Sequence, residues 1–65
     1  MNEGIEIKKA RLLLLDKTVT HGSSYEVTHE FIELMQEMWG MTYPEATRHM
    51  AQVRKTNHKT KYKIK

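Results

Sequence analysis

The sequence predicts a small α+β domain, and three observations indicate it. Apolar and polar residues alternate at Ile5-Glu6-Ile7, which is the period of a strand. Residues 29–39 instead place apolar side chains at i, i+3, i+4 and i+7, and residues 43–55 place them at i, i+3, i+7 and i+10, both typical of amphipathic helices. The final residues, HKTKYKIK, alternate again. We therefore expect one or two N-terminal strands, a two-helix hairpin, and a basic C-terminal strand or tail.

The apolar run at residues 10–15, ARLLLL, is the ambiguous element. A short apolar run bounded by charges is compatible with a buried strand or with a helix, and periodicity does not separate them. We favour a strand because Thr18-Val19-Thr20 follows, and β-branched side chains suit a pleated sheet. Turns are expected at Asp16-Lys17 and at residues 21–24, HGSS, with a short extended piece at residues 25–27. If the run is helical, the fold becomes all-α, with the helix-turn-helix arrangement that is described below.

The first helix is predicted over residues 29–39. Thr28 is its expected N-cap, because a threonine hydroxyl can accept a hydrogen bond from a free first-turn amide. Gly40 follows the last helical residue, where glycine commonly ends a helix. One apolar stripe is formed by Phe31, Leu34, Met35 and Met38, and the opposite face carries Glu30, Glu33 and Glu37.

The second helix is predicted from Tyr43 to about Lys55. Thr42 and Glu45 have the spacing of a capping box, in which each side chain bonds the other residue's amide. Pro44 is tolerated in a first helical turn. Asn57 is the expected end, and the apolar stripe consists of Tyr43, Ala46, Met50 and Val53. Residues 1–65 are treated as a single domain whose ends, residues 1–4 and 57–65, are expected to be flexible.

Bulk composition narrows the function classes. A chain of 65 residues without cysteine has neither disulfides nor a cysteine zinc site to support its small core. Such chains often gain burial by forming a homodimer, which the sequence leaves open. No apolar run approaches the roughly 20 residues needed to span a bilayer, and the N-terminus lacks the pattern of a secretory signal. We therefore expect a cytoplasmic protein that does not enter a membrane.

The charges are strongly segregated. Residues 1–45 carry all eight acidic and four basic residues, a net charge of −4, whereas residues 46–65 carry seven basic residues and no acidic one, a net charge of +7. Arg48, Gln52 and Lys55 lie at i, i+4 and i+7 on the second helix, away from its apolar stripe. Lysine and arginine bind phosphates through counterion release, so DNA is the expected partner. The expected nucleic-acid-binding residues are Arg48, Gln52, Arg54, Lys55, Lys59, Lys61 and Lys63.

Catalysis and metal binding find little support in the sequence. His21, Ser23 and Ser24 share a polar turn near Asp16, but nothing fixes the geometry that an activated nucleophile requires. The four histidines do not pair at i, i+3 or i+4, and His49 with Glu45 supplies only two ligands. We expect no enzyme activity, no cofactor and no metal.

Methionines and one tryptophan suggest a second kind of surface. Methionine is an adaptable contact residue, although such stripes usually belong to the core. Trp39 lies beside the main stripe of the first helix and is a candidate anchor for a partner. The alternative function is therefore a small inhibitor or adaptor that binds a protein with an acidic surface through its basic face, or binds through Met38, Trp39 and Met41.

Two DNA-binding families resemble parts of the chain. Residues 42–56, TYPEATRHMAQVRKT, resemble the middle of a helix-turn-helix, with Thr42, Glu45, Ala46 and Met50 at the matching places. This resemblance implies a turn near Ala51 and a recognition helix opening at Arg54, although the family usually has glycine at the turn. The two helices joined through residues 40–42 are similar to the ribbon-helix-helix family, which implies an intertwined dimer whose DNA-reading strand is residues 24–27. Both resemblances imply a small DNA-binding regulator of transcription.

Overall fold

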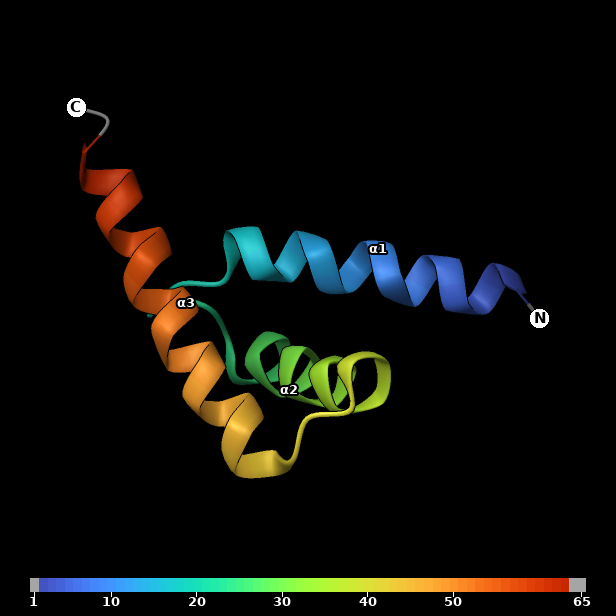
Figure 1. Cartoon of the computed structure of the whole chain (residues 1–65). Helices are drawn as coiled ribbons and strands as arrows, with labels where there is room; N and C mark the ends of the chain where they lie inside the picture. The colour runs from blue at the N-terminus through green and yellow to red at the C-terminus, as the bar shows by residue number, and fades with distance from the viewer. Residues whose placement is uncertain (1, 64–65) are drawn as a thin grey trace.

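Three α-helices form the structure, a computed structural model that describes the backbone of residues 2–63 and the side chains of residues 4–58. The helices are α1 (Asn2–Thr18), α2 (Tyr25–Trp39) and α3 (Tyr43–Lys63). Figure 1 shows α1 and α2 side by side and running in opposite directions, with α3 crossing one end of the pair. The part of the chain that the structure describes contains no strand, so the α+β expectation is wrong and the all-α alternative is the observed architecture.

The N-terminal strands predicted at residues 5–7, 10–15 and 18–20 are replaced by α1 and its C-terminal end. Leu12, Leu15 and Val19 are buried at i, i+3 and i+7, so they form the single core-facing stripe of a helix. Asp16 and Lys17 continue this helix and do not form a turn. The apolar run resembled a strand because Leu13 and Leu14, which are 51% and 50% exposed, extend the run onto the outer side of the helix.

The connection between α1 and α2 is the expected turn at residues 21–24. The Ser23 amide donates to the Thr20 carbonyl at 3.1 Å, and the Thr20 amide donates to Ser23 Oγ at 2.9 Å. Ser24 then caps α2, because its side chain accepts a hydrogen bond from the Val27 amide at 3.3 Å.

The first predicted helix therefore begins about one turn earlier than expected, at Tyr25, and the extended piece at residues 25–27 is wrong. Thr28 is not the cap, since its hydroxyl is buried within the helix and donates to the Tyr25 carbonyl at 2.9 Å. The predicted stripe of α2 is confirmed, with Phe31, Leu34 and Met35 buried. The strand of the ribbon-helix-helix resemblance, residues 24–27, is likewise replaced by the cap and first turn of α2.

The corner between α2 and α3 forms as the sequence predicts. Gly40 has a φ of 69°, the left-handed conformation that glycine adopts without strain, and its amide donates to the Gln36 carbonyl at 3.1 Å. The capping box is also confirmed. The Thr42 amide donates to Glu45 Oε1 at 2.9 Å, and the Glu45 amide donates to Thr42 Oγ1 at 3.3 Å.

The second predicted helix is longer than expected and continues without a break to Lys63. The end at Lys55, the stop at Asn57 and the C-terminal strand are therefore wrong, and so is the turn near Ala51 that the helix-turn-helix resemblance implied. Lysines that alternate with threonine, tyrosine and isoleucine fit a strand period, but the described part of the chain offers no strand with which they could pair. The expectation for residues 64–65 lies outside the described residues.

The core lies where the three helices meet. Phe31, Leu12, Met35 and Val19 are its largest fully buried side chains, and Ala46 and Val53 close it from α3. Tyr43 is 60% exposed and does not join the stripe predicted for the second helix. None of the described helices combines the length and the apolar character that crossing a bilayer requires.

Candidate functional site

The solvent-facing side of α3 brings together the central residues of the predicted nucleic-acid site. Ala46 and Val53 face the core, and Arg48, Gln52 and Lys55 are exposed on the other side of the same helix. A rotation of about 100° per residue puts these three side chains within a sector about 60° wide. We call Arg48, Gln52 and Lys55 the basic face of α3.

Arg54 does not belong to this face. Its side chain is partly buried, and its Nε is buried without a hydrogen-bond partner in the described part of the chain. Lys59, Lys61 and Lys63 belong to the backbone of α3, but their side chains lie outside the described residues. Figure 1 shows the last turns of α3 extending past the end of α1. The structure therefore groups three of the seven predicted residues, separates one, and leaves three side chains undescribed.

Two cations of α1, Lys8 and Arg11, are neutralised within the fold. Arg11 Nε and Nη2 donate to the two carboxylate oxygens of Glu30 at 2.9 and 3.0 Å. Lys8 Nζ lies 2.7 Å from a Glu37 carboxylate oxygen. In contrast, neither Arg48 nor Lys55 forms a salt bridge with any residue whose side chain the structure describes. Their charge is available to an external anion.

Two glutamates have lowered pKa values for identifiable reasons. The hydrogen bond from the Arg11 guanidinium lowers the pKa of Glu30, and the same contact raises the pKa of Arg11. The hydrogen bond from the Thr42 amide lowers the pKa of Glu45, with smaller help from the Thr42 hydroxyl and the Arg48 charge. Both glutamates are therefore fixed as anions at neutral pH, one between α1 and α2 and one at the start of α3.

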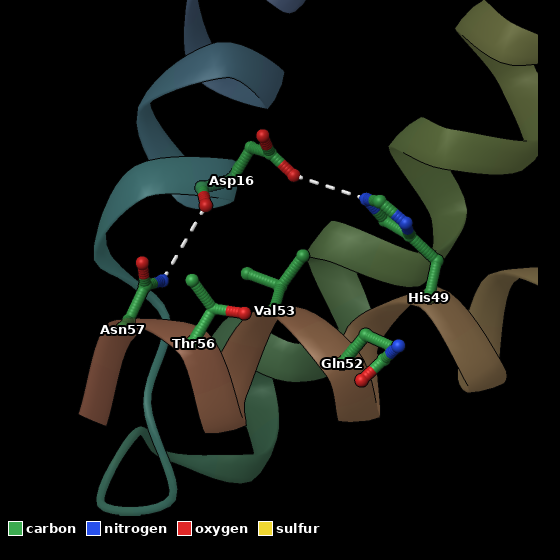
Figure 2. Close-up of a pocket in the computed structure, with 6 residues that line it drawn as sticks. All are labelled: Asp16, His49, Gln52, Val53, Thr56 and Asn57. Atoms are coloured by element: carbon green, nitrogen blue, oxygen red, sulfur yellow. Dashed lines mark hydrogen bonds and ion pairs between the residues drawn. The ribbon is translucent and has the colours of Figure 1, made fainter. Parts of the chain in front are cut away.

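A polar hollow lies beside the basic face, between α1 and α3 (Figure 2). Its volume is about 230 Å³. His49 Nε2 lies 3.1 Å from Asp16 Oδ1, and Asn57 Nδ2 donates to the Val19 carbonyl at 2.8 Å and to the Asp16 carbonyl at 3.4 Å. The hollow is lined by Asp16, His49, Gln52, Val53, Thr56 and Asn57.

These polar contacts tie the helices together. Asn57 satisfies carbonyl groups at the C-terminal end of α1, which would otherwise lack intrahelical partners. The His49 ring also meets Trp39 edge-on, with centroids 5.8 Å apart, so one side chain of α3 contacts both α1 and α2. The hollow is primarily a structural junction.

The polar side chains of the connection at residues 21–24 have structural partners. Ser23 and Ser24 accept hydrogen bonds in the turn and at the start of α2, and the His21 ring lies against His58 with centroids 6.0 Å apart. Asp16 pairs with His49 and not with His21. Across the described side chains, no three histidine or carboxylate groups are placed to hold a metal ion.

The three residues predicted to contact a protein partner, Met38, Trp39 and Met41, differ in exposure. Met38 and Met41 are partly buried and pack against the core. Trp39 is 43% exposed, although its ring makes a T-shaped contact with the His49 ring. Only Trp39 of this group presents substantial apolar surface to a partner.

Three contacts were not predicted from the sequence: Arg11 with Glu30, Asp16 with His49, and Asn57 with the end of α1. The paired residues are 19, 33 and 38–41 positions apart. No local pattern signals contacts at such distances, because they depend on how the helices pack.

Comparison of the chain with known protein families, with curated proteins and with solved structures finds no match.

Proposed function

We propose that this protein binds nucleic acid, with double-stranded DNA as the preferred form, through the basic face of α3. The observation that carries the proposal is the contrast in charge pairing. Lys8 and Arg11 of α1 are neutralised by glutamates of α2, while Arg48 and Lys55 of α3 stand exposed and form no salt bridge with a described side chain. Unpaired cations on one helix face bind phosphates and release their counterions.

The helix arrangement supports DNA over other polyanions. A three-residue link, Gly40-Met41-Thr42, joins α2 to the crossing helix α3. Helix-turn-helix proteins join two helices by such a short turn, often with a glycine, and place the second helix in the major groove. On this proposal α2 and α3 form the pair, in place of the turn near Ala51 that the sequence suggested.

The side chains of the basic face suit distinct contacts. Arg48 can bind a phosphate or pair with the major-groove edge of guanine, and Gln52 can pair with adenine. Lys55 is suited to a phosphate as a mobile point charge. Glu45 lies one turn before His49 and is held by its capping bonds to Thr42, so its negative charge is oriented toward the helix start.

The proposal is tested by matched charge reversals. Arg48→Glu and Lys55→Glu are each compared with Lys9→Glu, an exposed lysine of α1 with no salt bridge among the described residues. Each change alters the net charge by the same amount, so a general electrostatic effect weakens binding equally in all three. Fluorescence anisotropy of a labelled duplex should show at least a tenfold greater loss of affinity for the α3 variants. Equal losses would refute the basic face as the site.

The alternative function, a protein-binding inhibitor or adaptor, is supported by the exposed surface of Trp39. Trp39→Phe keeps an aromatic edge for His49 and removes part of the contact area. If a protein partner anchors on this side chain, the variant should weaken that complex while leaving DNA binding unchanged. Calorimetry with the purified partner separates these two outcomes.

A further inference from the structure

The outer face of α1 carries a second apolar surface that the core does not use. Ile7, Leu13 and Leu14 are 69%, 51% and 50% exposed, and Ala10 is exposed between them. The core stripe, Leu12 with Leu15 and Val19, faces the opposite direction. Clusters of exposed apolar side chains on a small protein commonly mark an interaction site.

Charges border this apolar surface in a particular order. A helix rotates about 100° per residue, which places Glu6 and Lys17 on the same side of α1 as Ala10. The two charges therefore lie at opposite ends of the apolar surface. Neither forms a salt bridge with a described side chain, in contrast to Lys8 and Arg11 on the side that meets α2. We define the outer face of α1 as Glu6, Ile7, Ala10, Leu13, Leu14 and Lys17.

We infer that the outer face of α1 binds the same face of a second copy of this chain, with the two helices antiparallel. About a twofold axis near residues 11 and 12, Glu6 of one copy lies opposite Lys17 of the second copy, and Ala10 lies opposite Leu13. Each charge gains one opposite partner, and the Glu6–Lys17 pair occurs twice in the dimer because a twofold contact repeats every pair. A parallel arrangement brings like charges together, so the charge order selects the antiparallel one.

The outer face of α1 is small. It spans about 17 Å of helix, which fits a small interface and a weak dimer. A chain this short buries only about 60% of its unfolded surface, so even modest additional apolar burial contributes to its stability. The interface leaves the basic face of α3 free and needs no nucleic acid. Experiments can therefore refute the proposed dimer without refuting the proposed DNA binding, and the reverse.

The first test measures the mass of the full chain without DNA by sedimentation equilibrium, up to about millimolar protein. The unmodified chain should form dimers, and Leu13→Glu and Leu14→Glu should remain monomers at every concentration. Lys9→Glu, on the same helix outside the face, should still dimerise. Circular dichroism confirms that each variant is helical. A monomeric unmodified chain, or dimers that survive the leucine changes, would overturn the inference.

A charge exchange tests the antiparallel pairing. Glu6→Lys or Lys17→Glu alone should weaken the dimer roughly tenfold, because two pairs change at once. The double variant Glu6→Lys with Lys17→Glu should restore it. Since the chain has no cysteine, Glu6→Cys and Lys17→Cys chains can also be mixed and oxidised. The mixed disulfide should dominate; predominance of the two symmetric disulfides would contradict antiparallel pairing.

Discussion

Asn57 shows how one side chain can connect two helices. The sequence suggested that it ends its own helix, but it instead donates hydrogen bonds to carbonyls at the end of α1. Asparagine is suited to this role because its amide group supplies two donors on a short side chain. Its position on α3 therefore helps to set the crossing of α3 against α1.

Asn57→Ala should lower the free energy of unfolding by about 1 kcal/mol, the usual net value of such a hydrogen bond. The cost stays moderate because the Asn57 side chain is only partly buried. Urea unfolding followed by circular dichroism measures the effect. Gln52→Ala, an exposed change on the same helix, should shift stability by less than about 0.5 kcal/mol. Equal effects would show that the Asn57 bonds do not stabilise the junction.

Glu45 makes the stability of the α3 start depend on pH. Its pKa in the folded state is lowered from the ordinary value of 4.5 by the hydrogen bond from the Thr42 amide. A carboxyl with a lowered folded-state pKa stabilises the fold fully above its unfolded pKa. That contribution is lost as the pH falls through the lower folded-state pKa. Acid should therefore destabilise the protein below about pH 4.5.

Glu45→Gln isolates this effect, because glutamine can also accept the Thr42 amide bond in a capping box but does not titrate. The variant should be less sensitive to pH between neutrality and acid in urea unfolding experiments. The remaining acid dependence should come mainly from Glu30, whose pKa is lowered by Arg11. An unchanged pH profile for the variant would contradict the role assigned to Glu45.

At the scale of single elements, local signals predicted the α2–α3 corner and failed for α1. Gly40 and the Thr42–Glu45 pair act through their own neighbours, so the sequence alone identifies them. The leucines of α1 lie on both sides of the helix and hide its period. The basic face was also predictable, because Arg48, Gln52 and Lys55 follow helical spacing. The partial burial of Arg54 was not predictable, because it depends on how the helices pack.

The leucine run provides a direct test of the helical register of α1. Leu12→Ala removes a fully buried side chain and should cost about 2–5 kcal/mol. Leu13→Ala changes a half-exposed side chain and should cost much less, about 0.5 kcal/mol. Thermal unfolding of the two variants gives the comparison at low protein concentration, where the proposed dimer dissociates. Similar losses of stability at both positions would contradict the observed register.

At the scale of the whole molecule, the fold separates two kinds of charge. The α1–α2 pair contains the salt bridges that neutralise Lys8 and Arg11, whereas α3 exposes Arg48 and Lys55. The core, the capping box and Asn57 all lie before residue 59. Folding and the proposed anion binding therefore depend on largely different residues of α3.

A chain ending at His58 tests this separation. It should retain the helical spectrum because the residues of the core remain, but it lacks four lysines, Lys59, Lys61, Lys63 and Lys65. If these lysines bind phosphates, the slope of log affinity against log salt should fall by about one for each phosphate that is no longer neutralised. Unchanged affinity and slope would exclude the C-terminal lysines from the DNA interface.

The most direct test of the central claim is the affinity of the unmodified chain for a labelled DNA duplex across a salt series. Fluorescence anisotropy should show binding that weakens linearly with salt in a log–log plot, with a slope near 0.9 for each phosphate neutralised. Single Arg48→Glu or Lys55→Glu changes should flatten that slope. Absence of binding at low salt would contradict a nucleic-acid function for the basic face of α3.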